Sequence, residues 1–166
     1  FHWLSATCSI GFFLLLNEII PVWIGEDYLL DQSVILSITI NFYIQNVINP
    51  IWIYRETMGL FNEVKYMMIF ASIINIIASI LLGIKFGLSG VIFATALARI
   101  LTSVWYEPII IFKKCFKKNV MSYWKKQIKY FGITILSLII CNYFISYLGS
   151  HILLIFLKII IILFVV

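Results

Sequence analysis

The chain has 166 residues, of which 63% are hydrophobic and 11% are charged, and its formal net charge is +5. Soluble globular domains carry roughly 25% charged residues, so a water-soluble fold could not cover this much apolar surface. The composition therefore excludes an ordinary soluble domain and predicts an integral membrane protein. Many tryptophans and tyrosines fall near the ends of the apolar runs, as in the aromatic belts of membrane interfaces.

A helix needs about 20 apolar residues to cross a hydrocarbon core of about 30 Å. The apolar runs predict spans near Trp3–Trp23, Val34–Tyr54, Tyr66–Lys85, Leu88–Phe112, Ile128–Leu148 and from Ile152 onward. A transmembrane barrel would instead show segments of about ten residues with alternating polarity, and these runs do not alternate. The predicted fold class is therefore all-α, a polytopic transmembrane bundle of about six helices.

The two ends of the sequence lie inside this pattern. The chain begins at Phe1 without a methionine and stops at Val166 inside an apolar run. We therefore expect a fragment from the internal or C-terminal part of a longer protein. The start lacks a basic segment followed by a short apolar stretch and a small-residue cleavage site, so no signal peptide is predicted.

The connections between the predicted spans differ sharply in charge. The connection 25–31 holds three acids and no Lys or Arg, 55–65 holds two bases and two acids, and 113–129 holds seven lysines and no acid. With six spans, the second and fourth connections share one side of the membrane. By the positive-inside rule that side is the cytoplasm, so 25–31 and the turns at 86–87 and 149–150 are predicted to face outward.

The lysine-rich connection 113–129 has more than one possible role. Because it lies between two membrane spans, a nucleic-acid interface is not favoured, and we predict no nucleic-acid partner. An orienting loop is the plainest interpretation. Contact with anionic lipid headgroups, worth about 1 kcal/mol per base, is the expected secondary role.

Arg99 is the most informative single residue, because it falls near the middle of the predicted fourth span. A central arginine costs about 2.5 to 3.5 kcal/mol on insertion scales, so its side chain should face a protein interior or a hydrated cavity. One possibility is a substrate-binding role. The other is a structural ion pair, for which Glu18 is the one acid inside another predicted span, although it lies toward the outer end.

Three amide residues, Asn41, Gln45 and Asn49, recur every four positions on the second predicted span, before Pro50. This spacing places them on one drifting stripe of the helix. Amide side chains can join helices in a bundle, and they can also line a hydrated cavity that binds sugar hydroxyls. Both interpretations stay open at this point.

The other polar residues give weaker signals. Glu107 is expected at the inner membrane interface, and Lys158 is expected either to extend toward solvent or to face an interior. The three cysteines and two histidines lack the spacing of a metal site. No paired carboxylates, nucleophile motif or phosphate-binding glycine loop is present, so no catalytic residue, metal or cofactor is predicted and an enzyme is not favoured.

Three stretches together carry a family resemblance. The first is Pro21–Leu30 (PVWIGEDYLL), the second joins Asn41–Gln45 (NFYIQ) to Pro50–Phe61 (PIWIYRETMGLF), and the third is Lys85–Thr95 (KFGLSGVIFAT), followed by WYEP and the lysines. They resemble the C-terminal portion of the Wzx-type polysaccharide flippases of the multidrug/oligosaccharidyl-lipid/polysaccharide (MOP) superfamily. The segment beginning at Tyr54 is the most specific part.

The resemblance implies an intact transporter of about twelve to fourteen helices in two pseudo-symmetric bundles around a central cavity. In this chain, residues 1–112 would be four helices of the second bundle, 113–129 the cytoplasmic lysine-rich loop, and 130–166 trailing transmembrane helices. The implied function is the flipping of an undecaprenyl-pyrophosphate-linked oligosaccharide from the inner to the outer leaflet of the bacterial cell membrane. Membrane lipids and polysaccharide assembly proteins are the other expected partners.

A pyrophosphate needs cations in a site of low dielectric constant. The substrate-binding candidates are therefore Arg99, Asn41, Gln45, Asn49 and Arg55, the last at the cytoplasmic mouth. Three rival functions remain: another exporter of the superfamily, coupled to a cation through an intramembrane acid such as Glu18; a membrane polysaccharide polymerase or acyltransferase; and a helical membrane scaffold in which the polar residues only pack.

Overall fold

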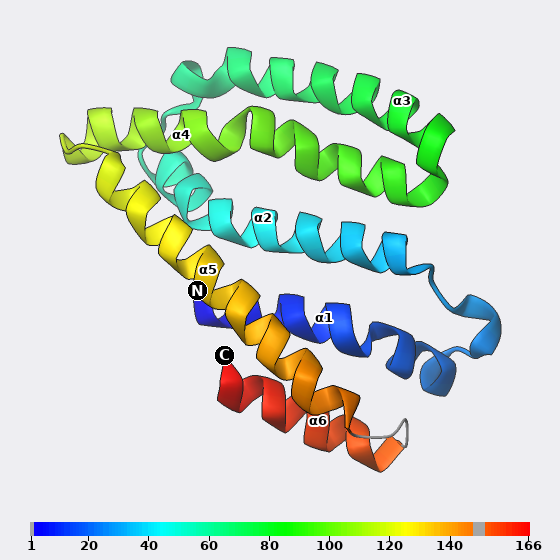
Figure 1. Cartoon of the computed structure of the whole chain (residues 1–166). Coiled ribbons are helices and arrows are strands. Elements are labelled where there is room, and N and C mark those ends of the chain that lie inside the picture. Colours follow the sequence, from blue (N-terminus) through cyan, green and yellow to red (C-terminus); the bar gives the residue numbers. More distant parts are fainter. Residues whose placement is uncertain (1, 148–151) are drawn as a thin grey trace.

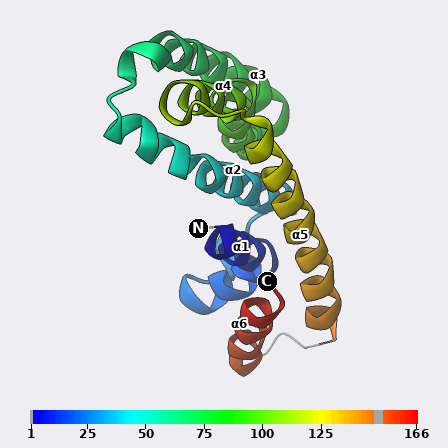
Figure 2. The same ribbon diagram turned by 90° about the vertical axis from the view of Figure 1, so that its left-hand side faces the viewer.

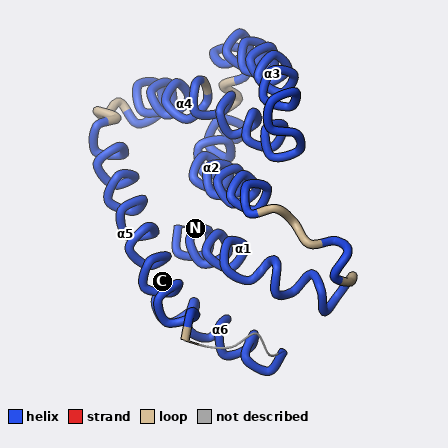
Figure 3. The backbone as a smooth tube through the Cα atoms, turned by 45° about the vertical axis from the view of Figure 1, so that its right-hand side comes forward, coloured by secondary structure: helices blue, strands red, loops and turns tan. Residues whose placement is uncertain are grey.

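The structure is a computed structural model that describes residues 2–147 and 152–166. In this part of the chain the backbone is helical, with short connections and no strand (Figure 3). The elements are α1 (His2–Trp23), η1 (Glu26–Tyr28), α2 (Gln32–Thr57), α3 (Phe61–Leu101), α4 (Ser103–Ile111), the π-helical turn η2 (Phe112–Phe116), α5 (Met121–Ser146) and α6 (Ile152–Val165). The predicted all-α class is confirmed.

Within residues 2–147 and 152–166, four helical stretches are long and apolar enough to cross a membrane: His2–Trp23, Gln32–Thr57, Phe61–Phe116 and Met121–Ser146. The third, with 56 residues, reverses direction at Gly87, where φ is 60° and ψ is −137°. Glycine adopts this conformation without the steric penalty of a Cβ atom. Residues 61–86 and 88–101 of α3 therefore form two antiparallel arms, here called the outgoing arm and the return arm (Figure 1).

The predicted reversal at 86–87 is confirmed. The third predicted span corresponds to the outgoing arm of α3, and the fourth corresponds to the return arm followed by α4. The predicted turn at 149–150 and the end of the fifth span lie outside the described residues. Two features differ from the prediction. The fourth span is not continuous but breaks at Thr102, and α5 begins at Met121, before the expected position at Ile128.

The early start of α5 changes the lysine-rich connection, because Lys125, Lys126 and Lys129 are helical. Lysine is a good helix former, and its long stem lets a helix continue beyond the apolar layer while the ammonium stays in water. The connection 113–129 is thus helical over much of its length, with irregular backbone confined to residues 117–120.

The helices stack in layers: the outgoing arm of α3, then the return arm continued by α4, then α2, α1 and α6. α5 crosses beside the lower part of this stack (Figures 1 and 2). α1 contacts α2 on one side and both α5 and α6 on the other. Buried apolar side chains form one cluster between α1, α5 and α6, namely Ile10, Leu15, Cys141, Ile145 and Ile162. A second cluster, Ile48, Ile51 and Ile111, joins α2 to α4.

The side chain of Asn17 bonds across the acidic connection that follows α1, a contact that the sequence pattern did not predict. Asn17 donates from its amide nitrogen to the carbonyl oxygen of Leu30 at 2.8 Å, and its oxygen accepts from the Leu30 N–H at 3.1 Å. Both backbone groups of Leu30 are therefore satisfied without water. The connection holds α1 and α2 as antiparallel neighbours.

The connections 55–65 and 113–129 meet at one end of the molecule. The ammonium of Lys114 lies 2.7 Å from the carboxylate of Glu63, which joins η2 to the start of α3. Figure 1 places the end of α2, the start of α3 and the start of α5 at this end, and residues 24–31 and the reversal at Gly87 at the other. The arrangement agrees with the predicted grouping of the connections by charge.

α6 is fixed to α1 by an ion pair. The ammonium of Lys158 lies 2.6 Å and 2.7 Å from the two carboxylate oxygens of Glu18, and the Lys158 side chain is only 1% exposed. Lys158 therefore faces an interior, one of its two predicted positions. The other predicted possibility, an ion pair between Glu18 and Arg99, is not present, because Glu18 binds Lys158 of α6.

This pair predicts an asymmetric response to substitution. Glu18→Ala should lower the stability by about 2 kcal/mol because it leaves a buried ammonium without a partner. Lys158→Met should lower the stability by less, because the unpaired Glu18 is partly exposed to solvent and methionine fills the space of the lysine stem. The double variant Glu18→Leu/Lys158→Met should recover most of the loss. Thermal unfolding of the purified chain in detergent measures all three, and equal losses in the two single variants would contradict the argument.

Candidate functional site

A cavity of about 320 Å³ lies between α2, both arms of α3 and α4. Its lining combines three charged residues with small, polar and aromatic ones. They are Trp52, Arg55, Met68, Ala71, Ser72, Asn75, Thr95, Ala98, Arg99, Ser103 and Glu107. A cavity with convergent polar groups inside an apolar helix bundle is the usual form of a ligand site in a membrane transporter.

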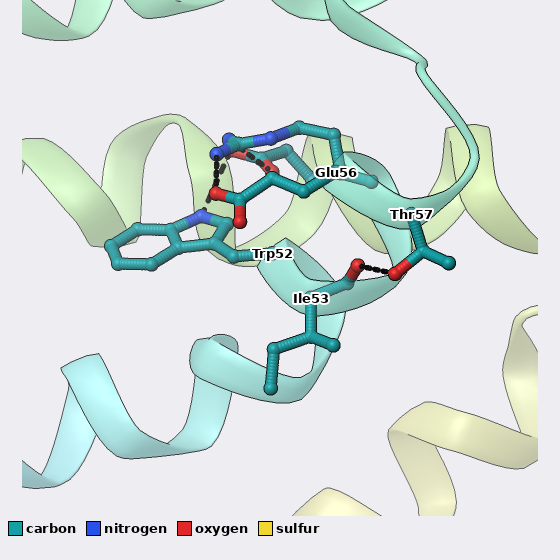
Figure 4. Close-up of polar contacts among 6 residues, drawn as sticks. Trp52, Ile53, Glu56 and Thr57 are labelled. Atoms are coloured by element: carbon teal, nitrogen blue, oxygen red, sulfur yellow. Dashed lines mark hydrogen bonds and ion pairs between the residues drawn. The ribbon is translucent and has the colours of Figure 1, made fainter.

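The mouth of the cavity near the end of α2 holds a buried ion pair. Arg55 lies 3.0 Å from Glu107, and the two side chains are 9% and 2% exposed. The indole N–H of Trp52 donates to the other oxygen of Glu107 at 3.3 Å. Figure 4 shows these polar contacts around Trp52 and Glu56, and Glu56 accepts a second contact from Arg55 at 3.4 Å.

The structure adds a partner to Glu107 that the sequence analysis did not predict. Glu107 was expected near the inner membrane interface, and its side chain is buried between α2 and α4, where Arg55 neutralises its charge. Burial of a carboxylate in lipid or protein requires such a partner. Arg55 keeps one unused donor, since its Nε atom is buried and has no hydrogen-bond partner within the described part of the chain.

Arg99 lies on the return arm of α3 and faces the same cavity. Its guanidinium donates to the side-chain oxygen of Asn41 at 2.6 Å and lies 5.8 Å from the ring centroid of Trp52. Arg55 lies at the same distance from that ring. The indole is thus flanked by two cations, each within the range of a cation–π contact.

The charge of Arg99 is not neutralised by a carboxylate. Among residues 2–147 and 152–166, no Asp or Glu lies within 4.0 Å of it. Asn41 and Trp52 are neutral, so they orient the guanidinium without cancelling its charge. The cavity therefore contains one paired arginine and one arginine available to an anion.

The helix break lies three residues beyond Arg99. Thr102 has φ −126° and ψ −86°, and it separates the return arm from α4. The Thr102 hydroxyl donates to the carbonyl of Ala98 at 2.6 Å, and the indole of Trp105 donates to the carbonyl of Leu101 at 2.8 Å. Side chains thus satisfy two carbonyls that the break frees. Discontinuous helices of this kind line substrate sites near the midplane of transporters.

The structure brings together only part of the predicted site. Arg99 and Arg55 each lie 5.8 Å from the ring of Trp52, and Asn41 joins the group through its hydrogen bond with Arg99. Gln45 is exposed and Asn49 is half-buried, and neither lines the cavity. A spacing of four residues rotates about 40° per step on a helix of 3.6 residues per turn, so the amide stripe does not follow one face.

Comparisons with protein-family models, curated proteins and solved structures found no match. The site is therefore argued from its own chemistry. Sequence reasoning missed Trp52 and Glu107 as members of it. Glu107 carried a usable signal, since it is an acid near the same predicted membrane end as Arg55 and such intramembrane charges normally pair. Trp52 carried none, because its position near a span end also fits an interface belt.

Proposed function

We propose that this chain forms part of a transporter that moves a lipid-linked oligosaccharide across a bacterial cell membrane, from the cytoplasmic to the outer leaflet. The observation that carries the proposal is Arg99, a cation that faces a cavity inside apolar helices and has no carboxylate partner among the residues that the structure describes. An unpaired arginine inside a membrane costs free energy, and this cost is offset when the side chain binds an anion during function. The pyrophosphate of a lipid-linked sugar is an anion of suitable charge.

The other lining groups support a sugar as the remaining part of the substrate. Ser72, Asn75, Thr95 and Ser103 offer hydroxyl and amide groups on three sides of the cavity. Sugar hydroxyls are recognised by such hydrogen-bonding side chains, and an indole such as that of Trp52 offers an apolar face. Residues 113–129 are then cytoplasmic and 25–31 lie outside, by the positive-inside rule.

The proposal is tested in the host strain by deleting the gene that encodes this chain. We expect lipid-linked oligosaccharide to accumulate in the inner leaflet while its synthesis continues, because the step between the leaflets is missing. Accessibility of the sugar to a membrane-impermeant lectin, measured on vesicles of each orientation, gives the leaflet. Normal appearance of the oligosaccharide in the outer leaflet would overturn the proposal, and a failure of its synthesis would indicate an enzyme instead.

One observation favours a second candidate, a cation-coupled exporter. Glu107 contributes a buried carboxylate to the cavity, and coupling through an intramembrane acid is a recognised role of such residues. Its ion pair with Arg55 argues against this candidate, because the charge of the carboxylate is already neutralised and does not need a coupling cation. Glu18, the acid considered from sequence, is bound to Lys158 and does not line the cavity.

A further inference from the structure

A second cavity, separate from the one around Arg99, lies where η2 meets α5. It has a volume of about 330 Å³ and is lined by Phe112, Phe116, Lys118, Ser122, Tyr123 and Lys126. These residues come from the π-helical turn, the irregular connection and the first turns of α5. Here they are called the lysine–aromatic pocket. None of them takes part in the proposed transport site.

The aromatic rings form the apolar side of the pocket. The ring centroid of Phe112 lies 5.3 Å from that of Phe116 and 5.7 Å from that of Tyr123. Phe116 in turn lies 5.4 Å from Tyr54 at the end of α2. The rings thus fix one another at the end of the apolar helices, where the headgroup layer of a membrane begins.

The polar side of the pocket carries unneutralised positive charge. Lys118 and Lys126 are exposed, and within the described ranges no carboxylate lies within 4.0 Å of either. The acid Glu63 at the start of α3 is bound to Lys114. Residues 113–129 contain seven lysines and no acid, so the pocket lies in a basic surface.

The backbone around the pocket is held in place. Lys117 adopts a left-handed conformation with φ 49°, and the N–H of Lys118 donates to the carbonyl of Phe112 at 3.1 Å. The side-chain oxygen of Asn119 accepts from the N–H of Met121, the first residue of α5, at 2.9 Å. Lys118 therefore lies on an ordered turn, and Lys126 lies in the first turns of α5 that follow it.

We propose that the lysine–aromatic pocket binds the phosphate headgroup of an anionic membrane phospholipid. The phosphodiester would lie between the ammonium groups of Lys118 and Lys126, and the hydroxyl of Ser122 would donate to it. The glycerol and the upper acyl chains would lie against Phe112, Phe116 and Tyr123. A free phosphate would use the lysines but not the rings, so the composition of the pocket favours a lipid.

The test titrates the purified full chain in detergent with short-chain phosphatidylglycerol, phosphatidylcholine or inorganic phosphate, and follows the thermal unfolding midpoint. We expect phosphatidylglycerol to raise the midpoint at lower concentrations than the other two. Lys118→Gln/Lys126→Gln should raise the apparent Kd for phosphatidylglycerol by about 10-fold or more. Lys125→Gln/Lys129→Gln removes the same charge from exposed positions outside the pocket and should change the Kd by less than about 3-fold.

Several results would overturn the proposal. Equal losses in the two double variants would indicate a diffuse basic surface, and an equal response to inorganic phosphate would indicate a simple anion site. Absence of a preference for phosphatidylglycerol in the unaltered chain would exclude the site altogether. If the pocket variant unfolds without lipid, Lys118→Arg/Lys126→Arg replaces it, and this variant should retain the preference because both charges remain.

Discussion

Arg99→Ala is expected to abolish assembly of the surface polysaccharide, to below about one hundredth of the normal amount, whereas Arg99→Lys should keep part of it. Each charge-assisted hydrogen bond to a phosphate contributes about 1.5 to 3 kcal/mol, so the loss of two reaches this range. Lysine retains the charge but not the two-pronged geometry of a guanidinium. The measurement is the amount of cell-surface polysaccharide in the host strain carrying each variant.

Asn41→Ala is the comparison, because it removes the hydrogen bond between Asn41 and Arg99 and keeps the charge of Arg99. If Arg99 binds substrate, Asn41→Ala should lose much less activity than Arg99→Ala, because it removes an orienting group but not the cation. If Arg99 only joins α2 to α3, the two alanine variants should be equally defective. Immunoblotting of membranes verifies that each variant is present at the normal level. Normal export by Arg99→Ala would exclude a role of Arg99 in the cavity.

Glu107→Ala is expected to give the largest loss of stability, about 3 kcal/mol. The substitution leaves the buried guanidinium of Arg55 without its main partner, and truncation of one member of a buried ion pair typically costs about 3 to 5 kcal/mol. We place the loss at the lower end because Glu56, at 3.4 Å, remains as a second partner. Denaturant or thermal unfolding of the purified chain in detergent measures the difference.

Glu56→Ala provides the comparison. Its side chain is 60% exposed, and exposed ion pairs contribute at most about 1 kcal/mol. A loss from Glu56→Ala as large as that from Glu107→Ala would contradict the importance of burial. Glu107→Gln should fall between the two, since the amide oxygen still accepts from Trp52 but no longer carries the opposite charge.

The sequence was sufficient for the features that depend on composition. Long apolar runs predicted helices because the backbone in lipid must satisfy its own hydrogen bonds, and Gly87 marked the reversal. The alternation of the predicted spans indicated which connections share an end of the molecule. The start of α5 was missed because lysines were taken to end the helix, although they only end the apolar layer.

The features that depend on tertiary contacts were not accessible in this way. The residues around Thr102 do not predict a helix break, because threonine is tolerated in helices. The carbonyls that the break frees are satisfied by nearby side chains, which only the structure shows. The choice of Lys158 over Arg99 as partner of Glu18 depends on how α6 packs on α1. The four-residue spacing predicted the amide stripe, but it did not predict that Asn41 would be the member that bonds to Arg99.

The contacts of α2 have a mechanical consequence for the break at Thr102. α2 bonds to the return arm through Asn41 and Arg99 and to α4 through Arg55 and Glu107. It therefore holds one contact on each side of the non-helical residue. These contacts with a neighbouring helix restrain the angle between the return arm and α4, and a ligand that draws Arg99 away from Asn41 removes one of those restraints.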